Sequence, residues 1–577
     1  MNGGDIIGRV LQEKQVKYLF TLCGGHISPI IVGAKSNGIR VIDVRHEATA
    51  VFAADAMARF SGIPGVAVVT AGPGVTNSIT ALKNAQLAES PIVLLGGAVA
   101  TVLKGKGALQ DIEQIKLLES TVKWASKIEQ DCDIVPMIEE AFDVAQSGIP
   151  GPIFLECPID LLYDEALVRK WYDIGSERQG TIRQKLTGWY LRRHVDKLFA
   201  CSDTEIKSEE QETEIIPFHV NEEDLEKILS QINNVEKPVM IIGSQSMIKT
   251  EEAENLSKAI EDLGIPVYLA GMARGLLGKD HPFYFRHKRT MALKEADLVI
   301  LAGMPQDFRL NYGRSINPKA YLISINRSEQ ELKKNRKPDL AVQADSSYFL
   351  QTLVQEEKID KDFREWIKTL RDRETARIDE IEQFMNEKTE YLNPLNLCQE
   401  IESVIDEDSI IVVDGGDFIA TASYIVKPTG PLRWIDAGPF GTLGAGAGFA
   451  LSAKLLNPNS EVWLLYGDGA AGYSIAEFDT FVRHDIPIIS IIGNDGGWTQ
   501  IQRDQVKYLG DDVATTLKHN DYHIVAKGYG AEGLFVNDPK NLTDILNEAK
   551  TLNKKGRPVL INALIGKTDF RDGSISM

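Results

Sequence analysis

The sequence predicts an α/β protein made of three doubly wound, parallel-sheet domains. Short apolar runs rich in Val, Ile and Leu alternate with helix-like stretches, which is typical of parallel strands covered on both faces. This alternation stops and resumes twice, once after a polar, acidic segment and once after a charged helical one. At about 100–200 residues per domain, a chain of 577 residues has room for three such units.

The first domain is predicted over residues 1–165. Helix-like stretches lie at 47–59 and 75–89, between strands expected at 18–21, 40–44, 65–69, 92–95 and 152–156. A linker follows over 166–222, with an amphipathic helix around 189–199 and an acidic stretch at 202–214. We expect that helix to pack on a neighbouring domain, and docking on a partner or a membrane surface is the alternative.

The second domain is predicted over 223–355, and a charged helical connector over 356–390 leads to the third domain over 391–577. The strands expected in the second domain are 238–243, 266–269, 297–302 and 321–325. Those expected in the third domain are 409–413, 433–435, 462–466, 488–493 and 558–563.

The overall charge excludes some classes of protein. Lys and Arg number 63 and Asp and Glu 82, so the net charge is −19. Such an acidic chain is unlike a sequence-independent nucleic-acid binder, and its charge disfavours nonspecific binding to anionic membranes.

No apolar run is long enough for an integral membrane segment, and the N-terminus is unlike a signal peptide. The five scattered cysteines form no CxxC pair, so we expect a soluble, cytoplasmic protein.

The segment from Tyr466 to Trp498 carries the strongest chemical signal. One apolar strand ends at Gly-Asp-Gly around Asp468, a helix follows, and a second strand ends at Asn-Asp-Gly-Gly around Asp495. Parallel strands end at the same edge of a sheet, where α/β proteins bind ligands, so the two carboxylates can converge. Two carboxylates and a backbone carbonyl suit an octahedral cation such as Mg²⁺, which leaves positions open for phosphate oxygens.

This segment resembles the signature of the thiamine diphosphate-dependent enzymes, Gly-Asp-Gly followed at a fixed spacing by Asn-Asn. The resemblance implies thiamine diphosphate and Mg²⁺ as cofactors, and it implies a pyrimidine-binding first domain and a diphosphate-binding third domain. The metal ligands that it implies are Asp468, Asp495 and the carbonyl of Gly497. The family normally has Asn where this chain has Asp495, which keeps an oxygen ligand and adds a negative charge. Contacts to the diphosphate are expected from Gly467, Gly469 and Ala470.

The family chemistry also requires a glutamate in the first domain. A carboxylate hydrogen-bonded to the cofactor's pyrimidine ring promotes the loss of a proton from its thiazolium carbon. Glu47 opens an Ala-rich helix after a predicted strand, as the family's glutamate does. In these families the glutamate and the metal site belong to different subunits. The resemblance therefore implies a homodimer or homotetramer with active sites at the interface.

Other positions follow from the same resemblance. In the first domain, Gly24, Gly25 and His26 correspond to the active-site loop, and Gln110 is expected to point at the reacting carbon. The residues expected to line the pyrimidine and brace Glu47 are Gly72, Gly74 and Asn77. In the third domain, backbone contacts to the diphosphate are expected from Gly415, Gly416 and Asp417, and Leu443 is expected to wedge the cofactor into its bent form.

Within this superfamily the chain as a whole resembles the 2-hydroxyacyl-CoA lyases. Segments that carry this likeness run from TLCGGHISP, near residue 21, to the C-terminal KTDFRDGSISM. The implied reaction cleaves a 2-hydroxyacyl-CoA into formyl-CoA and an aldehyde one carbon shorter, or runs in reverse, with His26 and Gln110 handling the substrate hydroxyl. Acetolactate synthase and oxalyl-CoA decarboxylase are the alternatives. Animal members have an N-terminal membrane anchor, which this sequence does not show.

The middle domain has two glycine-rich segments, GMARGLLG and GMPQDFRLNYG. Related enzymes bind FAD, ADP or CoA in this domain, and we expect ADP or CoA rather than FAD. Arg274 and Arg309 are candidate partners for a diphosphate, because the guanidinium fork matches phosphate oxygens. The alternative is that both are ordinary surface arginines.

Overall fold

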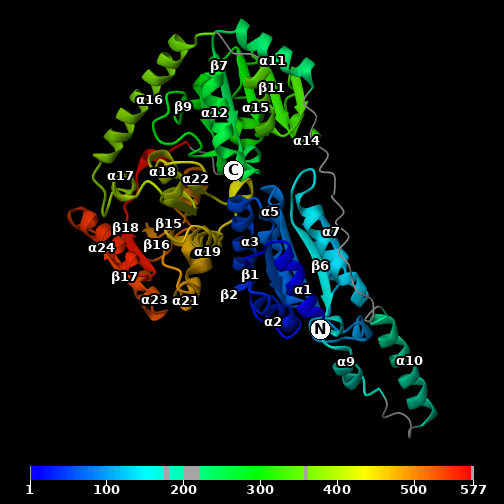
Figure 1. Cartoon of the computed structure of the whole chain (residues 1–577). Coiled ribbons are helices and arrows are strands. Elements are labelled where there is room, and N and C mark those ends of the chain that lie inside the picture. Colours follow the sequence, from blue (N-terminus) through cyan, green and yellow to red (C-terminus); the bar gives the residue numbers. More distant parts are fainter. Residues whose placement is uncertain (1, 175–180, 201–220, 357–360, 574–577) are drawn as a thin grey trace. The chain divides into compact units, whose positions relative to one another are not determined.

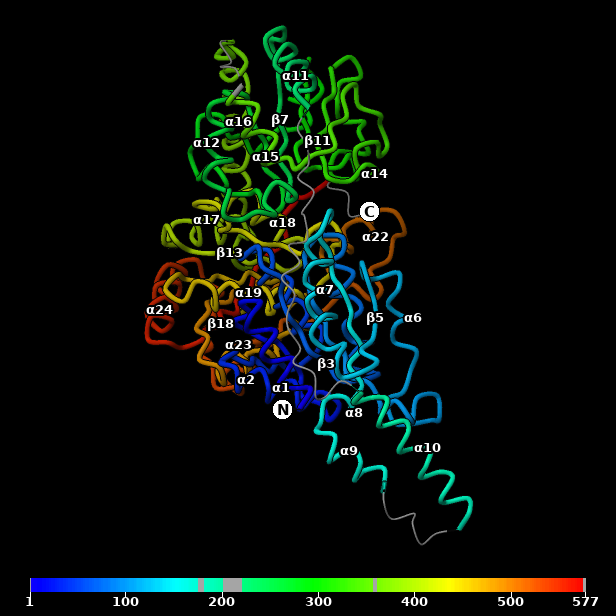
Figure 2. The backbone as a smooth tube through the Cα atoms, turned by 45° about the vertical axis from the view of Figure 1, so that its right-hand side comes forward, coloured from blue at the N-terminus to red at the C-terminus, as the bar shows by residue number. Residues whose placement is uncertain are grey.

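The computed structural model describes residues 2–174, 181–200, 221–356 and 361–573. These residues fall into two compact units, the first made of residues 1–58 and 63–215 and the second of residues 59–62 and 216–577. Cys201 and the acidic stretch 202–214 of the predicted linker lie outside the described residues. The described part contains three six-stranded sheets, and every pair of neighbouring strands in them is parallel (Figures 1 and 2).

The sheet of the first unit has the strand order β2-β1-β3-β4-β6-β5. Its strands are β1 (Tyr18–Thr21), β2 (Arg40–Asp43), β3 (Gly65–Val69), β4 (Ile92–Ala98), β5 (Trp124–Lys127) and β6 (Ile153–Pro158). The chain winds from β1 outward to β2 and then returns to β3 on the other side of β1. In α/β sheets such a reversal is where a ligand-binding crevice is expected, here at the carboxyl ends of β1 and β3.

The second unit holds the other two sheets, and each contains the same kind of reversal. The middle sheet has the order β12-β11-β10-β7-β8-β9, with its reversal between β7 and β10. The C-terminal sheet has the order β14-β13-β15-β16-β18-β17, with its reversal between β13 and β15. The strands of the middle sheet are β7 (Pro238–Ile242), β8 (Val267–Leu269), β9 (Tyr284–Phe285), β10 (Leu298–Ala302), β11 (Tyr321–Asn326) and β12 (Leu340–Gln343). Those of the C-terminal sheet are β13 (Ile410–Asp414), β14 (Trp434–Ile435), β15 (Val462–Gly467), β16 (Ile489–Asn494), β17 (Glu532–Val536) and β18 (Val559–Leu564).

Helices surround all three sheets (Figure 1). Those of the first unit are α1 (Gly3–Glu13), α2 (Ser28–Ser36), α3 (Glu47–Ser61), α4 (Pro73–Asn77), α5 (Ile79–Leu87), α6 (Gln114–Leu118), α7 (Ile134–Gln146), α8 (Ile159–Leu162), α9 (Glu165–Trp171) and α10 (Ile182–Leu198). The middle sheet is accompanied by α11 (Glu222–Asn234), α12 (Ala253–Leu263), α13 (Arg289–Glu295), α14 (Glu329–Leu332), α15 (Ser346–Glu356) and α16 (Arg364–Met385). The C-terminal sheet is accompanied by α17 (Pro394–Val404), α18 (Asp417–Ile425), α19 (Gly446–Leu456), α20 (Asp468–Ser474), α21 (Phe478–Arg483), α22 (Thr499–Leu509), α23 (Tyr522–Gly528) and α24 (Leu542–Lys554).

The predicted α/β class and the parallel sheets are confirmed, and the expected strands match observed ones to within a few residues. Four strands were not predicted, namely β5, β9, β12 and β17, and all four lie at the edges of their sheets. The linker helix is longer than expected, since α10 begins at Ile182, and the charged connector contains α16. None of the helices described is both long and apolar enough to cross a bilayer.

Candidate cofactor site

The crevice of the first unit lies between the loops that follow β1 and β3. Gly24 approaches the β3 end so closely that a Cβ there would lie 2.3 Å from Thr70 Cβ. His26 Nδ1 lies 3.3 Å from Thr70 Oγ1. The loop after β1 therefore requires glycine at position 24, and it holds the His26 ring against the neighbouring strand end.

Gly72 and Gln110 meet at the same crevice. Gly72 has φ +62°, and a Cβ on it would lie 2.8 Å from the carbonyl oxygen of Gln110. Burial lowers the pKa of His26, while a hydrogen bond with Gln110 raises it in part. The two residues that the sequence assigns to the substrate hydroxyl are therefore hydrogen-bonded neighbours.

Gln114 also supports this loop, although no sequence motif pointed to it. The amide of Gly72 donates to Gln114 Oε1 at 2.8 Å, and Gln114 Nε2 donates to Glu156 Oε2, also at 2.8 Å. A buried glutamine that satisfies both a loop amide and a strand carboxylate fixes the turn. It lies four residues after Gln110 along the chain.

Glu47 is the first residue of α3, and its side chain is buried, with 7% of its surface exposed. Asn77, the last residue of α4, donates from Nδ2 to Glu47 Oε2 at 3.0 Å. The structure thus brings together Glu47 and the residue expected to brace it. The other carboxylate oxygen, Oε1, is not held by this bond.

The carboxyl ends of β15 and β16 carry the two acidic side chains predicted to converge. Asp468 directly follows β15, and Asp495 directly follows β16. The amide of Gly497 donates to Asp468 Oδ2 and to Asp495 Oδ1, at 3.2 Å in both cases. Both carboxyl groups therefore converge on one backbone amide, and their role as metal ligands stays a prediction.

The electrostatics of this pair suit a cation. Burial and the neighbouring charge of Asp495 raise the pKa of Asp468 to about 7. Burial also raises the pKa of Asp495. A divalent cation would neutralise two buried carboxylates and prefers their oxygens as ligands, so these residues fit Mg²⁺. In the described part of the chain, no group of three or more His, Cys, Asp or Glu side chains is placed to hold a metal ion.

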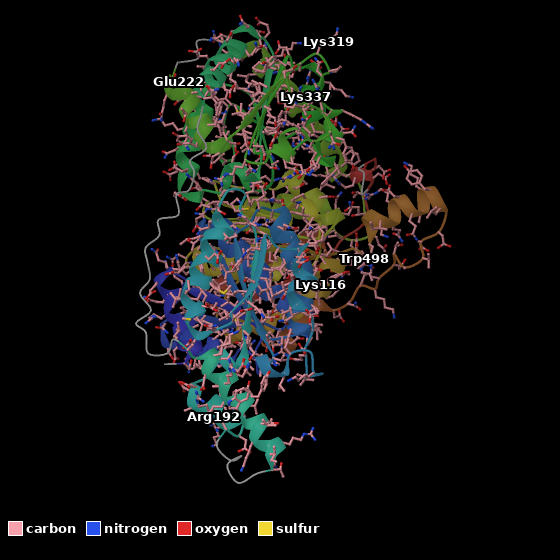
Figure 3. All side chains as sticks on the ribbon, turned by 90° about the vertical axis from the view of Figure 1, so that its right-hand side faces the viewer. Lys116, Arg192, Glu222, Lys319, Lys337 and Trp498 are labelled. Carbon is pink, nitrogen blue, oxygen red and sulfur yellow. The ribbon has the colours of Figure 1, made fainter. Side chains whose placement is uncertain are left out.

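Glycines bring the loops of the C-terminal sheet together. A Cβ on Gly415 would lie 2.8 Å from the amide nitrogen of Gly467, so the ends of β13 and β15 meet where only glycine fits. A Cβ on Gly469 would lie 2.3 Å from the ring of Trp498, which is labelled in Figure 3. The indole of Trp498 therefore packs directly on Gly469, the last residue of the Gly-Asp-Gly motif.

Asp414 connects two of the loops expected to hold the cofactor. Its buried carboxylate accepts from the amides of Gly444, at 3.0 Å, and Gly446, at 2.8 Å. Burial raises the pKa of Asp414 to about 6, and these two amides oppose the rise. Leu443, the predicted wedge, is half-buried in the loop that Asp414 holds.

Helix α18 begins directly after Gly415 and Gly416, in the loop that follows β13, and hydrogen bonds hold it at both ends. At its start, Arg503 donates to both carboxylate oxygens of Asp417, at 3.0 and 2.9 Å. At its end, Arg286 donates to the carbonyls of Ser423, Ile425 and Val426. Arg274 donates to the Ser423 carbonyl as well, and its guanidinium lies 5.0 Å from the ring centre of Trp434.

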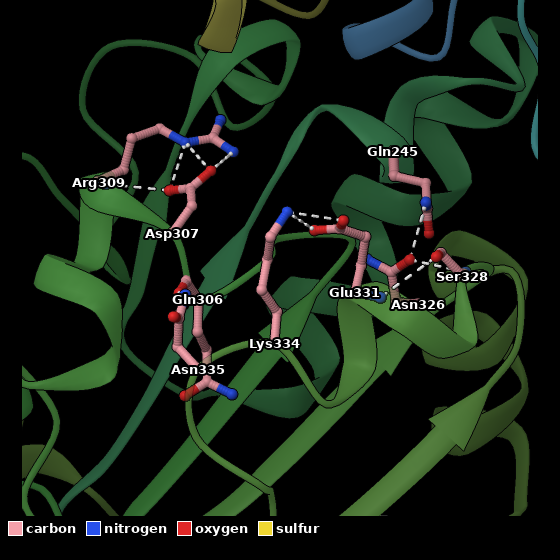
Figure 4. Close-up of polar contacts among 9 residues, drawn as sticks. All are labelled: Gln245, Gln306, Asp307, Arg309, Asn326, Ser328, Glu331, Lys334 and Asn335. Carbon is pink, nitrogen blue, oxygen red and sulfur yellow. Dashed lines mark hydrogen bonds and ion pairs between the residues drawn. The ribbon is translucent and has the colours of Figure 1, made fainter. Parts of the chain in front are cut away.

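The other predicted arginine is also engaged within the protein. Figure 4 shows Arg309 forked against Asp307, with Nε 3.0 Å from Oδ1 and a terminal nitrogen 2.6 Å from Oδ2. In the same view, Gln245 Nε2 donates to Asn326 Oδ1 at 3.0 Å, which joins the ends of β7 and β11. Whether either arginine also binds a phosphate stays a prediction.

Three family models match the chain in order. They are described as the N-terminal TPP binding domain, the central domain and the C-terminal TPP binding domain of thiamine pyrophosphate enzymes. The residues matched are 1–117, 225–353 and 414–563, respectively. The chain belongs to the thiamine pyrophosphate enzyme family. Thiamine pyrophosphate is the same compound as thiamine diphosphate, so the candidate sites at the ends of β1 and β3 and of β15 and β16 lie in domains described as TPP binding.

Individual members of the family resemble the chain along its whole length. The 2-hydroxyacyl-CoA lyase 2 of Danio rerio is 47% identical, with 100% of this chain and 93% of the relative covered. The human protein of that name is 45% identical, with 100% and 92% covered. The acetolactate synthase large subunit IlvG of Mycobacterium tuberculosis is 31% identical, with 98% and 96% covered.

Proposed function

We propose that this thiamine pyrophosphate enzyme cleaves a 2-hydroxyacyl-CoA into formyl-CoA and an aldehyde one carbon shorter, reversibly. The observation that carries the proposal is the identity of 45–47% to relatives named 2-hydroxyacyl-CoA lyase 2, against 31% to an acetolactate synthase. The reaction balances without a redox partner. The bond between C1 and C2 breaks, the C2 hydroxyl loses its proton, and C1 gains one.

The Glu47 carboxylate would hydrogen-bond to a nitrogen of the cofactor's pyrimidine ring and promote proton transfer within that ring. When bound, thiamine diphosphate supplies a carbon nucleophile and an electron sink for the bond that breaks. Asn77 holds one oxygen of Glu47 and leaves the other for a ring nitrogen. Burial of the carboxylate strengthens such a hydrogen bond, because few water molecules compete for it.

The substrate hydroxyl is handled by His26 and Gln110. Because burial lowers the pKa of His26, its imidazole is neutral at neutral pH and can accept a proton. Gln110 cannot take a proton, but its side-chain amide can hydrogen-bond to His26 and to the substrate oxygen and so orient the two groups relative to each other. In this assignment His26 is the proton acceptor and Gln110 the positioning residue.

The diphosphate and its Mg²⁺ bind at the C-terminal sheet. Asp468, Asp495 and the carbonyl of Gly497 supply the metal's protein ligands. The amides of Gly415 and Gly416 would face phosphate oxygens, whereas the amide of Gly469 donates to Asp468 Oδ1 at 2.8 Å. The convergence of both carboxylates on Gly497 supports this assignment.

In the middle domain we propose a site for ADP or the ADP part of CoA. Buried Gln306 supports a polar ligand there, because its Oε1 has no hydrogen-bond partner among the described residues. The guanidinium of Arg309 would have to donate to a phosphate as well as to the Asp307 carboxylate that it now binds. Mass spectrometry of ligands released from the purified protein tests this, and recovery of FAD would contradict it.

We also propose that the enzyme is a cytoplasmic homodimer or homotetramer, in which Glu47 of one subunit serves the diphosphate site of another. An activity test of mixed subunits checks the shared site. Glu47→Gln and Asp468→Asn chains should each have little activity alone, and mixing them should restore a fraction of the activity. If each subunit used its own Glu47 and Asp468, mixing would restore nothing.

The activity itself is tested with three substrates in parallel. With thiamine diphosphate and Mg²⁺, a 2-hydroxyacyl-CoA should give an aldehyde and formyl-CoA, which chromatography with mass detection quantifies. Pyruvate and oxalyl-CoA test the two alternatives through release of CO₂. Turnover of either compound without cleavage of any 2-hydroxyacyl-CoA, over a range of chain lengths, would reject the proposal.

A further inference from the structure

Helix α10, in the predicted linker, has apolar side chains on two opposite faces. Val195 and Leu198 lie on one face and are buried, and Leu198 belongs to the hydrophobic core of the first unit. The opposite face is apolar as well, although it is exposed. Its members, with their exposed fractions, are Ile182 (81%), Leu186 (63%), Trp189 (57%) and Tyr190 (53%).

These four residues form a continuous stripe. At 3.6 residues per turn, positions 182, 186, 189 and 190 fall on the same side of a helix. Tyr190 stacks on His194, with ring centres 6.2 Å apart, and Arg193 lies over the Trp189 ring at 5.6 Å. We call these four residues the α10 stripe. A contiguous exposed apolar stripe of this kind marks an interaction site.

The C-terminal half of α10 fixes the helix to its unit. His194 Nε2 lies 2.7 Å from Thr101 Oγ1, which itself lies 2.5 Å from the buried carboxylate of Asp160. On the neighbouring helix α9, Arg169 donates to Asp196 at 2.5 Å. Figures 1 and 2 show α9 and α10 projecting together from one end of the first unit. The stripe occupies the N-terminal half, which stands clear of the sheet.

The charge of α10 is opposite to that of the chain. The helix has five basic residues and one acidic residue, Asp196, whereas the whole chain has a net charge of −19. The basic residues are Arg183, Lys185, Arg192, Arg193 and Lys197, and Arg192 is labelled in Figure 3. Basic side chains beside an apolar stripe with Trp and Tyr are the features of helices that lie in the interface of anionic membranes.

We propose that the α10 stripe docks the enzyme on an anionic lipid surface. The stripe consists of four exposed apolar side chains, whereas a standard protein interface uses about 20–30 residues and roughly 800 Å² per partner. A fluid bilayer, in contrast, accommodates one convex helix, and its headgroups attract the basic flanks. The acidic remainder of the chain opposes general adsorption, so the attachment is confined to α10, reversible and sensitive to salt.

Flotation of the full-length protein with vesicles tests the proposal. The vesicles contain phosphatidylcholine alone, or phosphatidylcholine and phosphatidylserine in a two-to-one ratio. We expect binding to the mixed vesicles at low salt and weak binding at high salt or to phosphatidylcholine alone. Leu186→Glu should lower the partition coefficient about tenfold or more, because it replaces an exposed apolar side chain that would enter the bilayer with a charge. Ile378→Glu, an equivalent change at an exposed position of α16, should leave it unaltered.

A spectroscopic variant separates lipid contact from other effects. Brominated lipids should quench Trp189 fluorescence, and Trp189→Phe should lose that quenching while it still floats with the vesicles. The lyase activity and melting temperature of each variant confirm that it is folded. The proposal is overturned if the protein does not bind mixed vesicles, or if Leu186→Glu binds as the parent does. It is also overturned if Leu186→Glu lowers the oligomeric mass instead, because a second copy would then cover the stripe.

Discussion

Asp495 adds a negative charge to the candidate metal site beside Asp468. The family pattern normally has Asn at position 495, and the resulting extra charge is buried beside Asp468. Burial and then the charge of Asp495 raise the pKa of Asp468, so both effects disfavour its charged form in the absence of a cation. Both carboxylates nevertheless meet at the Gly497 amide.

Substitution of Glu47 gives the sharpest test of the active site. Glu47→Gln should lower kcat by about 100-fold or more, because the amide cannot relay a proton. Its binding of thiamine diphosphate, measured by calorimetry, should change little. Glu222→Gln, which alters the exposed first turn of α11, serves as the control. Retention of full turnover by Glu47→Gln would remove this residue from the mechanism.

Asp414 gives a prediction about pH. Its pKa is raised from the usual 3.8 to about 6, so the folded protein holds this proton more tightly than the unfolded chain does. The resulting contribution to stability is complete below about pH 3.8 and is lost as the pH rises through about 6. Asp414→Asn has no such titration. The melting temperature of the parent minus that of Asp414→Asn, in EDTA, should therefore decrease between about pH 5 and about pH 7.5. A constant difference would contradict the shifted pKa.

Short motifs pointed to some residues of the candidate site and not to others. His26, Gln110, Glu47 and Asn77 were named because short segments around them resemble family motifs, and their roles stay predictions. The supporting residues Gln114, Arg286 and Arg503 lie far along the chain from the groups that they hold. Their contacts depend on tertiary packing, and a single sequence contains no local signal for it.

The central strands of the described sheets were all predicted, whereas four of the six edge strands were not. Every residue of β3, β7 and β16 is buried, and such strands read as continuous apolar runs. The edge strands β5 and β12 are largely exposed, so their sequences, WASK and LAVQ, lack such a run. β9 is buried but only two residues long. The four missed edge strands are therefore short, partly exposed or both, while the edge strands β2 and β14 were predicted.

Helix α18 links the middle sheet to the diphosphate loop, and this link is testable. Arg286→Gln should remove hydrogen bonds to three carbonyls at the end of α18 and destabilise the second unit by about 3 kcal/mol. Because α18 begins at Gly416 and Asp417, the Kd for thiamine diphosphate should also rise.

Arg371→Gln provides the matched control, since Arg371 binds the carbonyls of Pro282 and Tyr284, away from α18. It should lower the melting temperature without altering the Kd for thiamine diphosphate. Equal effects of both variants on that Kd would mean that Arg286 has no specific role in positioning the loop.

Ligand binding and the stability of the complete protein are coupled. Thiamine diphosphate with Mg²⁺, at about 100 times its Kd, should stabilise the folded state by about 2.7 kcal/mol. Calorimetry should show this as a higher melting temperature that EDTA reverses. Asp468→Asn should abolish most of the increase, whereas Asp485→Asn, a surface change near the end of α21, should retain it. An increase that survives Asp468→Asn would place the metal elsewhere.

The parallel sheets have a consequence for how the protein is made. Each sheet draws its strands from one continuous stretch, 18–158, 238–343 or 410–564. Parallel pairing requires long crossovers, and such non-local contacts form slowly and expose unpaired edges meanwhile. Because the stretches do not interleave, each sheet can close on the ribosome before the next has been translated. We therefore expect efficient folding during synthesis, and slow, aggregation-prone refolding of the full-length chain from denaturant.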